Sequence, residues 1–328
     1  MINKLYIYES ACVDPYVNIA TEKYLLENVP ADACILYLWQ NKNTVVIGRN
    51  QNPWVECRTS LLETEGGKLA RRLSGGGAVF HDMGNLNFTF LVNSEDYDLD
   101  KQFAVIQTAC DYAGIKTERS GRNDLTAQGQ KFSGNAFYHA QGKSYHHGTL
   151  LIDADMDKLS RYLTPSKAKL KAKGVSSVRS RVVNLRELSP ALNCDAMKKL
   201  MAQAFCAVYG LTSTEFTFSD TAQAKIAEDA RKLQSWDWLY GPKLPFTFSC
   251  EQRFAWGSFS LQLNVEAGMV KTVGINTDAM EWDLGESIKA ALTGCRFQAD
   301  ALYDALSAQN LDAQIKTDIC SLIQTQEL

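Results

Sequence analysis

The chain contains the run Arg71-Arg72-Leu73-Ser74-Gly75-Gly76-Gly77-Ala78-Val79-Phe80-His81-Asp82, on which our interpretation of the fold depends. Its three consecutive glycines cannot stabilise a helix or a strand, because glycine loses more backbone entropy on folding than any other residue. Glycine is useful where the backbone turns with positive φ or approaches a ligand with no Cβ in the way. The preceding arginines and the following apolar run indicate a loop that binds an anion, such as phosphate or carboxylate, and then enters a strand.

This run matches neither the GxGxxG fingerprint of dinucleotide-binding folds nor the GxxxxGK[ST] pattern of P-loops. A glycine-rich hairpin loop with two solvated arginines explains the three glycines equally well. The choice between the two interpretations therefore depends on the rest of the chain.

Composition places the chain among ordinary globular proteins. With 328 residues, 45% hydrophobic and 22% charged, it is long enough for one large domain and a small one. A formal net charge of −3 argues against a general nucleic-acid binder. No apolar run approaches the roughly 18 residues of a membrane helix, and the N-terminus resembles a first strand rather than a signal peptide. We expect a soluble, cytoplasmic protein that binds neither nucleic acid nor membranes.

The nine cysteines are scattered and include no CxxC pair. This pattern is typical of reduced thiols and not of a disulfide framework or a zinc site. A dyad of Ser74 with His81 or His147 is conceivable, but no GxSxG elbow is present. Adjacent residues of a strand point to opposite faces, so at most one of His146 and His147 enters a site.

The order of the elements predicts an α/β (α+β) fold with two domains, residues 1–245 and 246–328. In the first, short strands alternate with helices, and Cys34–Trp39 and Thr44–Ile47 are expected to form a hairpin. In the second, four short alternating runs form a β-meander that three helices follow.

Lys131 is the residue that we expect to carry the chemistry. Gln128-Gly129-Gln130 predicts a turn, which would bring Lys131 across a hairpin to Asn123 and Asp124. An ammonium group there is suited to neutralising a carboxylate and an α-phosphate while they react. A surface lysine at a hairpin is the alternative. With Arg72 and the glycine amides, the set favours ATP-dependent activation of a carboxylate.

A basic segment covers residues 166–181, where Lys167, Lys169, Lys171 and Lys173 alternate with small or apolar residues. One interpretation is a solvated basic helix or loop. The other is a mobile segment that closes over a polyanionic ligand.

These residues resemble the sequence blocks of the lipoate–protein ligase A family, whose RRxSGGGxVxHD signature matches residues 71–82. The further matching blocks, in the family's order, are 44–54, 121–124, 131–136, 146–151 and 173–182. The tail after residue 246 resembles the accessory domain of the bacterial two-domain ligases. The resemblance implies a mixed-sheet catalytic domain of the biotin/lipoate ligase type, flanked by helices, and a small α+β accessory domain.

The implied reaction has two steps. Lipoate attacks the α-phosphate of ATP, with Mg²⁺, to give lipoyl-adenylate and pyrophosphate, and a lysine ε-amine of an apo lipoyl domain then takes the lipoyl group. The implied acceptors are acyltransferase subunits of 2-oxoacid dehydrogenases and the glycine-cleavage H protein. Octanoate is a possible substitute for lipoate, and no tightly bound prosthetic group is expected.

The resemblance also implies site residues. Lys131 would be catalytic and would touch both ligands. ATP or the adenylate would be bound by Arg72, Gly77, Ala78, Val79, Phe80, Asn123 and Asp124, with Asp124 also a candidate metal ligand. Lipoate would be bound by Arg49, Ser74, Gly76, His81, His147 and Thr149, and the loop over the adenylate would include Lys173, Gly174, Val175, Ser177 and Val178. Asn135 departs from the serine that other members often carry.

Three alternatives remain. An octanoyl or lipoyl transferase shares the fold but works through an acyl-cysteine, which the Lys131 block lacks. A biotin ligase would be expected to show a different glycine-arginine loop. A non-catalytic protein would bind lipoate without releasing pyrophosphate.

Overall fold

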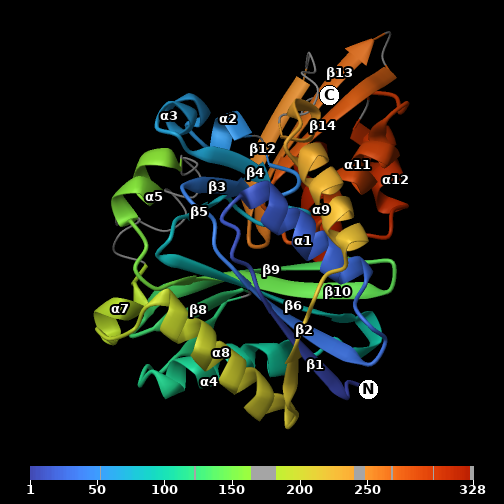
Figure 1. Ribbon diagram of the computed structural model, residues 1–328. Helices are drawn as coiled ribbons and strands as arrows, with labels where there is room; N and C mark the ends of the chain where they lie inside the picture. Colours follow the sequence, from blue (N-terminus) through green and yellow to red (C-terminus); the bar gives the residue numbers. More distant parts are fainter. Residues whose placement is uncertain are drawn as a thin grey trace.

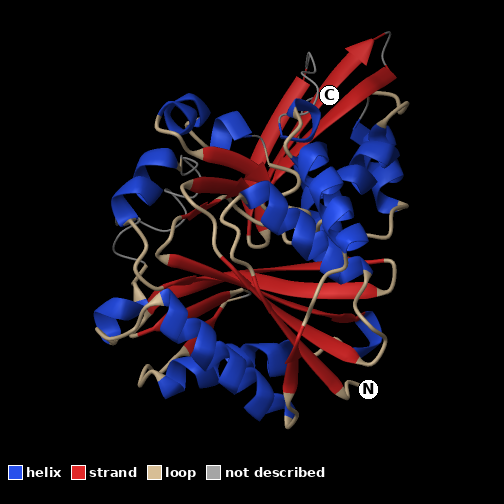
Figure 2. Ribbon diagram, in the orientation of Figure 1, coloured by secondary structure: helices blue, strands red, loops and turns tan. Residues whose placement is uncertain are grey.

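The fold is known from a computed structural model, which describes residues 1–51, 53–121, 123–163, 182–239, 248–266, 269–297 and 299–325. Its main feature is an eight-stranded mixed sheet with helices on both faces (Figures 1 and 2). The strands, in spatial order, are β11 (Ser213–Glu215), β1 (Lys4–Glu9), β2 (Ala33–Trp39), β6 (Asn85–Asn93), β10 (Lys143–Leu151), β9 (Gln130–Ala140), β8 (Asp124–Ala127) and β7 (Glu118–Ser120). The pairs β11–β1 and β1–β2 are parallel, and the other pairs are antiparallel.

Two helices cover each face of the large sheet. Helices α4 (Leu99–Tyr112) and α8 (Cys194–Tyr209) pack on one face around Phe88, Phe90 and Phe205. Helices α1 (Pro15–Glu27) and α9 (Asp220–Leu233) pack on the other. Helix α1 begins where Asp14 accepts hydrogen bonds from the backbone N–H groups of residues 16 and 17, which satisfies donors that the first helical turn leaves free.

A smaller sheet carries the glycine-rich run. Its central strand β3 (Thr44–Ile47) pairs in parallel with β4 (Lys68–Arg71) and antiparallel with β5 (Val79–His81). The glycine loop connects β4 to β5. The remaining helices of this region are α2 (Pro53–Glu56), α3 (Thr59–Thr64), η1 (Ser94–Asp96), α5 (Met156–Tyr162), α7 (Leu185–Leu188) and α10 (Trp236–Leu239).

The C-terminal region has a hydrophobic core of its own. The strands β12 (Phe248–Phe254), β13 (Gly257–Glu266) and β14 (Met269–Thr277) form an antiparallel meander. It packs with α11 (Leu284–Leu292), α12 (Ala299–Ser307) and α13 (Ala313–Gln324). The predicted α/β (α+β) fold class is confirmed. The boundary at residues 245 and 246 lies outside the described residues and stays a prediction.

The C-terminal region contacts the glycine loop directly. The Gly76 N–H donates to the Ala279 carbonyl at 2.6 Å, and the Asn50 side chain donates to the Trp282 carbonyl at 3.1 Å. The Trp282 ring also packs on Tyr138 of β9, with ring centres 4.8 Å apart. Residues 277–285 therefore lie against the part of the chain that we expected to carry the site.

The prediction that residues 34–39 and 44–47 form a hairpin is wrong. Strand β2 pairs with β1 and β6, whereas β3 belongs to the smaller sheet. The polar residues 40–43 connect two sheets, so the chain turns out of one sheet and into another instead of folding back.

Among the described residues, no helix combines the length and apolarity that a membrane-spanning segment requires.

Candidate functional site

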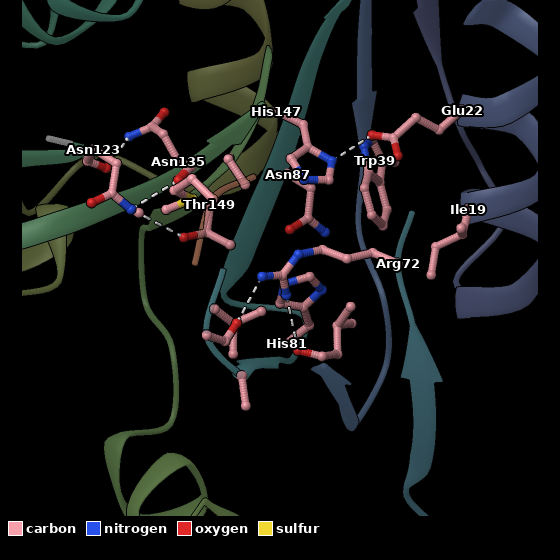
Figure 3. A pocket seen from close by; sticks show the side chains of 18 of the residues that line it. Ile19, Glu22, Trp39, Arg72, His81, Asn87, Asn123, Asn135, His147 and Thr149 are labelled. Carbon is pink, nitrogen blue, oxygen red and sulfur yellow. Dashed lines mark hydrogen bonds and ion pairs between the residues drawn. The ribbon is translucent and has the colours of Figure 1, made fainter. Parts of the chain in front are cut away.

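A cavity of about 260 Å³ lies between the large sheet and the smaller sheet (Figure 3). Helix α1, strands β2, β3, β6, β9 and β10, and the glycine loop all contribute to its wall. The lining residues are Ile19, Glu22, Trp39, Val46, Arg72, Gly77, Ala78, Val79, His81, Asn87, Asn123, Lys131, Gly134, Asn135, Ala136, His147, Gly148, Thr149 and Met280. Met280 comes from the C-terminal region, which thus supplies part of the wall.

The two ends of the cavity differ in exposure and chemistry. At one end lie Gly77, which is partly exposed, and Lys131, whose side chain is 38% exposed. At the other, Ile19, Trp39 and Val46 are buried. The cavity therefore has an open, cationic mouth and a closed end with several apolar side chains.

Arg72 holds the glycine loop in place. Its guanidinium donates to the Gly75 carbonyl at 2.7 Å, to the Gly77 carbonyl at 2.8 Å and to the Val46 carbonyl at 3.3 Å. Gly76 has φ +91°, which side-chain-bearing residues rarely adopt, and a Cβ there would lie 2.9 Å from the arginine. The glycines thus allow the loop to wrap around a buried cation.

Arg72 also places a positive charge in the wall of the cavity. Burial lowers the pKa of its guanidinium to about 10, so it remains charged near pH 7. No carboxylate of the described residues lies within ion-pair distance of it, and its hydrogen bonds go to carbonyl and hydroxyl oxygens. The nearest carboxylate in the cavity wall, Glu22, acts on Arg72 only through its charge, so the guanidinium can stabilise an anionic ligand nearby.

Asn123, Asp124 and Lys131 lie close together at the hairpin, as the sequence predicted. Strands β8 and β9 turn at residues 128 and 129, and Lys131 Nζ lies 2.7 Å from Asp124 Oδ1. Asn123 is held beside them, because its side chain donates to the Asn135 carbonyl at 2.9 Å and its own carbonyl accepts from the Asn135 side chain. Asn135 therefore fixes Asn123 at the mouth.

His147 belongs to a buried chain of hydrogen bonds that crosses the cavity wall (Figure 3). Its Nδ1 lies 2.7 Å from Glu22 Oε1, and its Nε2 lies 2.8 Å from Ser74 Oγ. The Arg72 Nε–H donates to the same Ser74 oxygen at 3.1 Å. Because the Glu22 carboxylate can only accept, His147 Nδ1 is the nitrogen that donates to it.

His146, by contrast, points into the core, as the alternation along a strand requires. Its Nε2 lies 2.8 Å from Asn135 Oδ1, and Phe103 packs against its ring. It supports the site from behind, through Asn135, without lining the cavity.

The structure brings most predicted site residues together. Lys131, Arg72, Gly77, Ala78, Val79, Asn123, His81, His147 and Thr149 line the cavity, and Asp124 and Ser74 bond directly to lining residues. Phe80 points away, into a small core that includes Tyr162. Gly76 touches the C-terminal region instead of lining the cavity. The predicted capping loop, with Lys173, Gly174, Val175, Ser177 and Val178, lies outside the described residues.

Arg49 lies elsewhere. Its guanidinium packs over the Trp238 and Trp282 rings, 5.3 Å and 5.9 Å from their centres, and lines a second cavity between α1, α9 and the β9–β10 turn. The structure does not place it in the wall of the first cavity. Sequence spacing could not reveal this, because the loop after β3 has no periodicity that fixes the direction of a side chain.

Sequence reasoning missed five buried lining residues, namely Ile19, Glu22, Trp39, Val46 and Asn87. The available signals were a carboxylate within the apolar pattern of α1 and two asparagines, Asn85 and Asn87, within an otherwise apolar strand. Buried polar residues of this kind need partners or ligands.

Two other chemistries find no support in the described residues. None of the nine cysteines lines the cavity, so an acyl-cysteine has no candidate there. No group of three or more His, Cys, Asp or Glu side chains converges within the described ranges. Asp124 contributes a single carboxylate, which suits an ion that phosphate groups largely hold.

Buried histidines make stability depend on pH. Burial lowers the pKa of His81 to about 3 and that of His146 well below its usual value. The unfolded chain binds these protons below about pH 6.5 and the folded chain does not, so stability falls as pH falls below that value. The expected slope is about 1.4 kcal/mol per pH unit for each histidine. In urea denaturation at pH 7, 6 and 5, the unfolding free energy of His81→Phe should fall less steeply with pH than that of the wild-type protein, by about 1.4 kcal/mol per pH unit. Equal slopes for the two proteins would contradict the assignment.

The comparisons with known proteins agree with this fold and site. Residues 14–206 match the family model of the lipoyl protein ligase A/B catalytic domain, and residues 243–324 match that of the bacterial lipoate protein ligase C-terminus. The chain is 42% identical over 313 residues to the lipoate-protein ligase A of Psychrobacter cryohalolentis, covering 92% of this chain and 89% of that one.

Solved structures show the same architecture. The Plasmodium falciparum LipL1 crystal structure in complex with lipoate has a TM-score of 0.86 at 26% identity, covering 98% of this chain and 99% of that one. A lipoate-protein ligase A bound with ATP has a TM-score of 0.64 at 24% identity, covering 74% and 99%, and shares the fold.

The family models and the 42% identical relative define an enzyme of the ligase class. The chain belongs to the lipoate–protein ligase family, whose members attach lipoate to proteins.

Proposed function

We propose that this enzyme activates free lipoate with MgATP and transfers the lipoyl group to a lysine of an apo lipoyl domain. One observation carries the proposal: a single cavity joins the partly exposed Lys131 at its open end to the buried Arg72 and to the buried apolar side chains of Ile19, Trp39 and Val46. A chain of carbons ending in a carboxylate fits this arrangement, with the tail inside and the carboxylate at the mouth.

In the first step, a lipoate carboxylate oxygen forms a bond to the α-phosphorus of ATP, and the bond from that phosphorus to pyrophosphate breaks. The two approaching groups are both anionic. Lys131 at the mouth and Arg72 behind the glycine loop reduce their repulsion, and this stabilisation matters most as charge develops on the α-phosphate. The Lys131–Asp124 ion pair positions the ammonium group before the ligands arrive.

In the second step, the acceptor ε-amine attacks the lipoyl carbonyl, AMP leaves, and the amine loses a proton. The acceptor lysine reaches the carbonyl only from the open end, because the other end is closed. Because the Lys131 ammonium group is partly exposed at the mouth, it can act in both steps. Mg²⁺ would enter with ATP, and Asp124 is the carboxylate of the described mouth best placed to contribute an oxygen to it.

The relatives support the ligands that we propose. The LipL1 crystal structure contains lipoate, and a lipoate-protein ligase from Thermoplasma acidophilum is described as bi-partite together with its E2 lipoyl domain. For the present chain we expect the E2-type lipoyl domains of 2-oxoacid dehydrogenases and the glycine-cleavage H protein as acceptors.

One assay tests the proposal. Purified protein, free lipoate, MgATP and an apo lipoyl domain are incubated, and the mass of the acceptor is measured. We expect the acceptor to gain one lipoyl group only when lipoate and ATP are both present, with release of pyrophosphate. Transfer from octanoyl carrier protein without ATP would instead show an acyltransferase, and lipoate binding without pyrophosphate release would show a binding protein.

A further inference from the structure

Strand β9 carries a β-bulge next to Lys131, where it runs beside β8 (Figure 1). Ser133 pairs with Leu125, and the next pair along the two strands joins Lys131 to Thr126. Phe132 is therefore an extra residue, and together with Ser133 it opposes a single residue of β8. Bulges of this kind often change the direction in which a nearby side chain points.

The bulge puts Lys131 and Gly134 on the same face of the large sheet. In an uninterrupted strand, residues three positions apart point to opposite faces. Here both residues line the cavity. Phe132, between them, is fully buried in the core that α4 and α8 cover on the opposite face. With Gly134 in the same place, a strand without the bulge would turn Lys131 toward that core.

The Lys131 side chain extends over Gly134. A Cβ on Gly134 would lie 3.0 Å from Lys131 Nζ and 3.2 Å from Lys131 Cε. Apart from the chain neighbours, no other atom of the described residues lies within 4 Å of that position. Atoms in contact are normally about 3.5–4.0 Å apart, so Lys131 would have to move. Asp124, which holds the ammonium group at 2.7 Å, is the residue of β8 that pairs with Gly134.

The backbone conformation at Gly134 does not itself require glycine. Gly134 has no positive φ, unlike Gly129 in the preceding turn, where φ is +77°. Glycine also weakens the interior of a strand, because it loses more backbone entropy on folding and has no side chain to pack. A glycine that destabilises the strand without a conformational need points to a need for space, and the end of the Lys131 side chain occupies that space.

The backbone of the bulge is held on the side away from β8 as well. The Lys131 carbonyl accepts a hydrogen bond from the Val183 N–H at 2.9 Å, and the Gly134 N–H donates to Thr149 Oγ1 at 3.4 Å. Because the backbone is fixed from both sides, a new side chain at position 134 would displace the flexible lysine side chain and leave the strand in place.

We propose that Gly134 is a positioning residue for Lys131: its bare backbone reserves the place beside Asp124 that the ammonium group occupies. The inference rests on the role of Lys131 in the proposed function. A lysine stem has four methylene groups and many rotamers, so the ammonium group is placed only by what surrounds it. A side chain at position 134 would push it away from Asp124. A misplacement of about 1 Å can lower a rate about 10²-fold.

The test adds carbon atoms at this contact and measures lipoate-dependent pyrophosphate exchange by the full chain with MgATP. Gly134→Ala should lower kcat about tenfold and Gly134→Val about 10²-fold, with the KM for lipoate unchanged, because the ammonium group acts on charge that develops in the reaction. The urea midpoint should stay equal or rise, because alanine and valine lose less backbone entropy than glycine on folding. Activity should thus fall without any loss of stability.

A double-mutant cycle with Lys131→Ala is the control. In that background Gly134→Ala should lower exchange no further, because the added carbon acts through the ammonium group. A further tenfold loss would show that the carbon obstructs a ligand directly, which would overturn the inference. Wild-type exchange rates in both Gly134→Ala and Gly134→Val would also overturn it, as would a lowered urea midpoint, which would show that the strand itself needs glycine. The proposed function fails separately, if the wild-type protein shows no lipoate-dependent exchange.

Discussion

Lys131→Ala should reduce lipoate-dependent exchange of pyrophosphate into ATP by about 10²–10³-fold while the protein remains folded. The ammonium lies at the mouth and acts on charge that develops in the reaction, and removing one such group from a preorganised site typically costs about 10²–10³-fold. Its only ion pair in the described structure joins it to Asp124, and both side chains are about one-third exposed. Partly exposed pairs contribute at most about 1 kcal/mol to stability.

The matched control is Lys116→Ala. Lys116 also pairs with an aspartate, Asp111 at 2.9 Å, but is exposed and far from the cavity wall. Its removal should leave exchange unchanged. Exchange that survived Lys131→Ala at the wild-type rate would refute the role of Lys131, and a large drop in melting temperature would show that the residue is mainly structural.

Arg72→Gln should lower kcat/KM for lipoylation by about 10²-fold and should also destabilise the fold by about 1–3 kcal/mol. Both effects follow from the same contacts. The guanidinium donates to the carbonyls of Gly75, Gly77 and Val46, which a glutamine cannot reach together, and it supplies a buried positive charge in the cavity wall. Urea denaturation and the acceptor-mass assay measure the two effects separately.

Arg72→Lys separates charge from geometry. Lysine keeps the cation but lacks the planar fork that binds several carbonyls at once. We therefore expect it to restore little of the stability and little of the activity. Full activity in Arg72→Lys would show that the cavity needs only a charge and that the shape of the glycine loop is of minor importance.

The parts of the site that depend on local geometry were predictable from sequence. The turn at residues 128 and 129 brings Lys131 to Asp124, and strand alternation sends His146 and His147 to opposite faces. The motif blocks also predicted the protein family, and the comparisons confirm that prediction. In each case the relevant residues are close in sequence, so short-range rules were sufficient.

The parts that depend on distant pairing were not predictable. Strand β2 joins β1 and β6 instead of its neighbour β3, because its side chains are buried on both faces of a large sheet. Glu22 and Trp39 meet the glycine loop only through this arrangement. Arg49 follows β3 directly but turns toward two tryptophans, one of them more than 200 positions away in sequence.

Met280 lines the cavity, although it belongs to the C-terminal region and not to the region that carries Lys131 and Arg72. Its loop is held by the hydrogen bond from Gly76 to Ala279, yet it belongs to a region with a separate hydrophobic core. Changes in residues 277–285 can therefore reshape the substrate chamber without altering Lys131, Arg72 or the sheet that supports them. The shape of the acyl group that the cavity accepts can therefore change through the C-terminal region while the reacting residues stay the same.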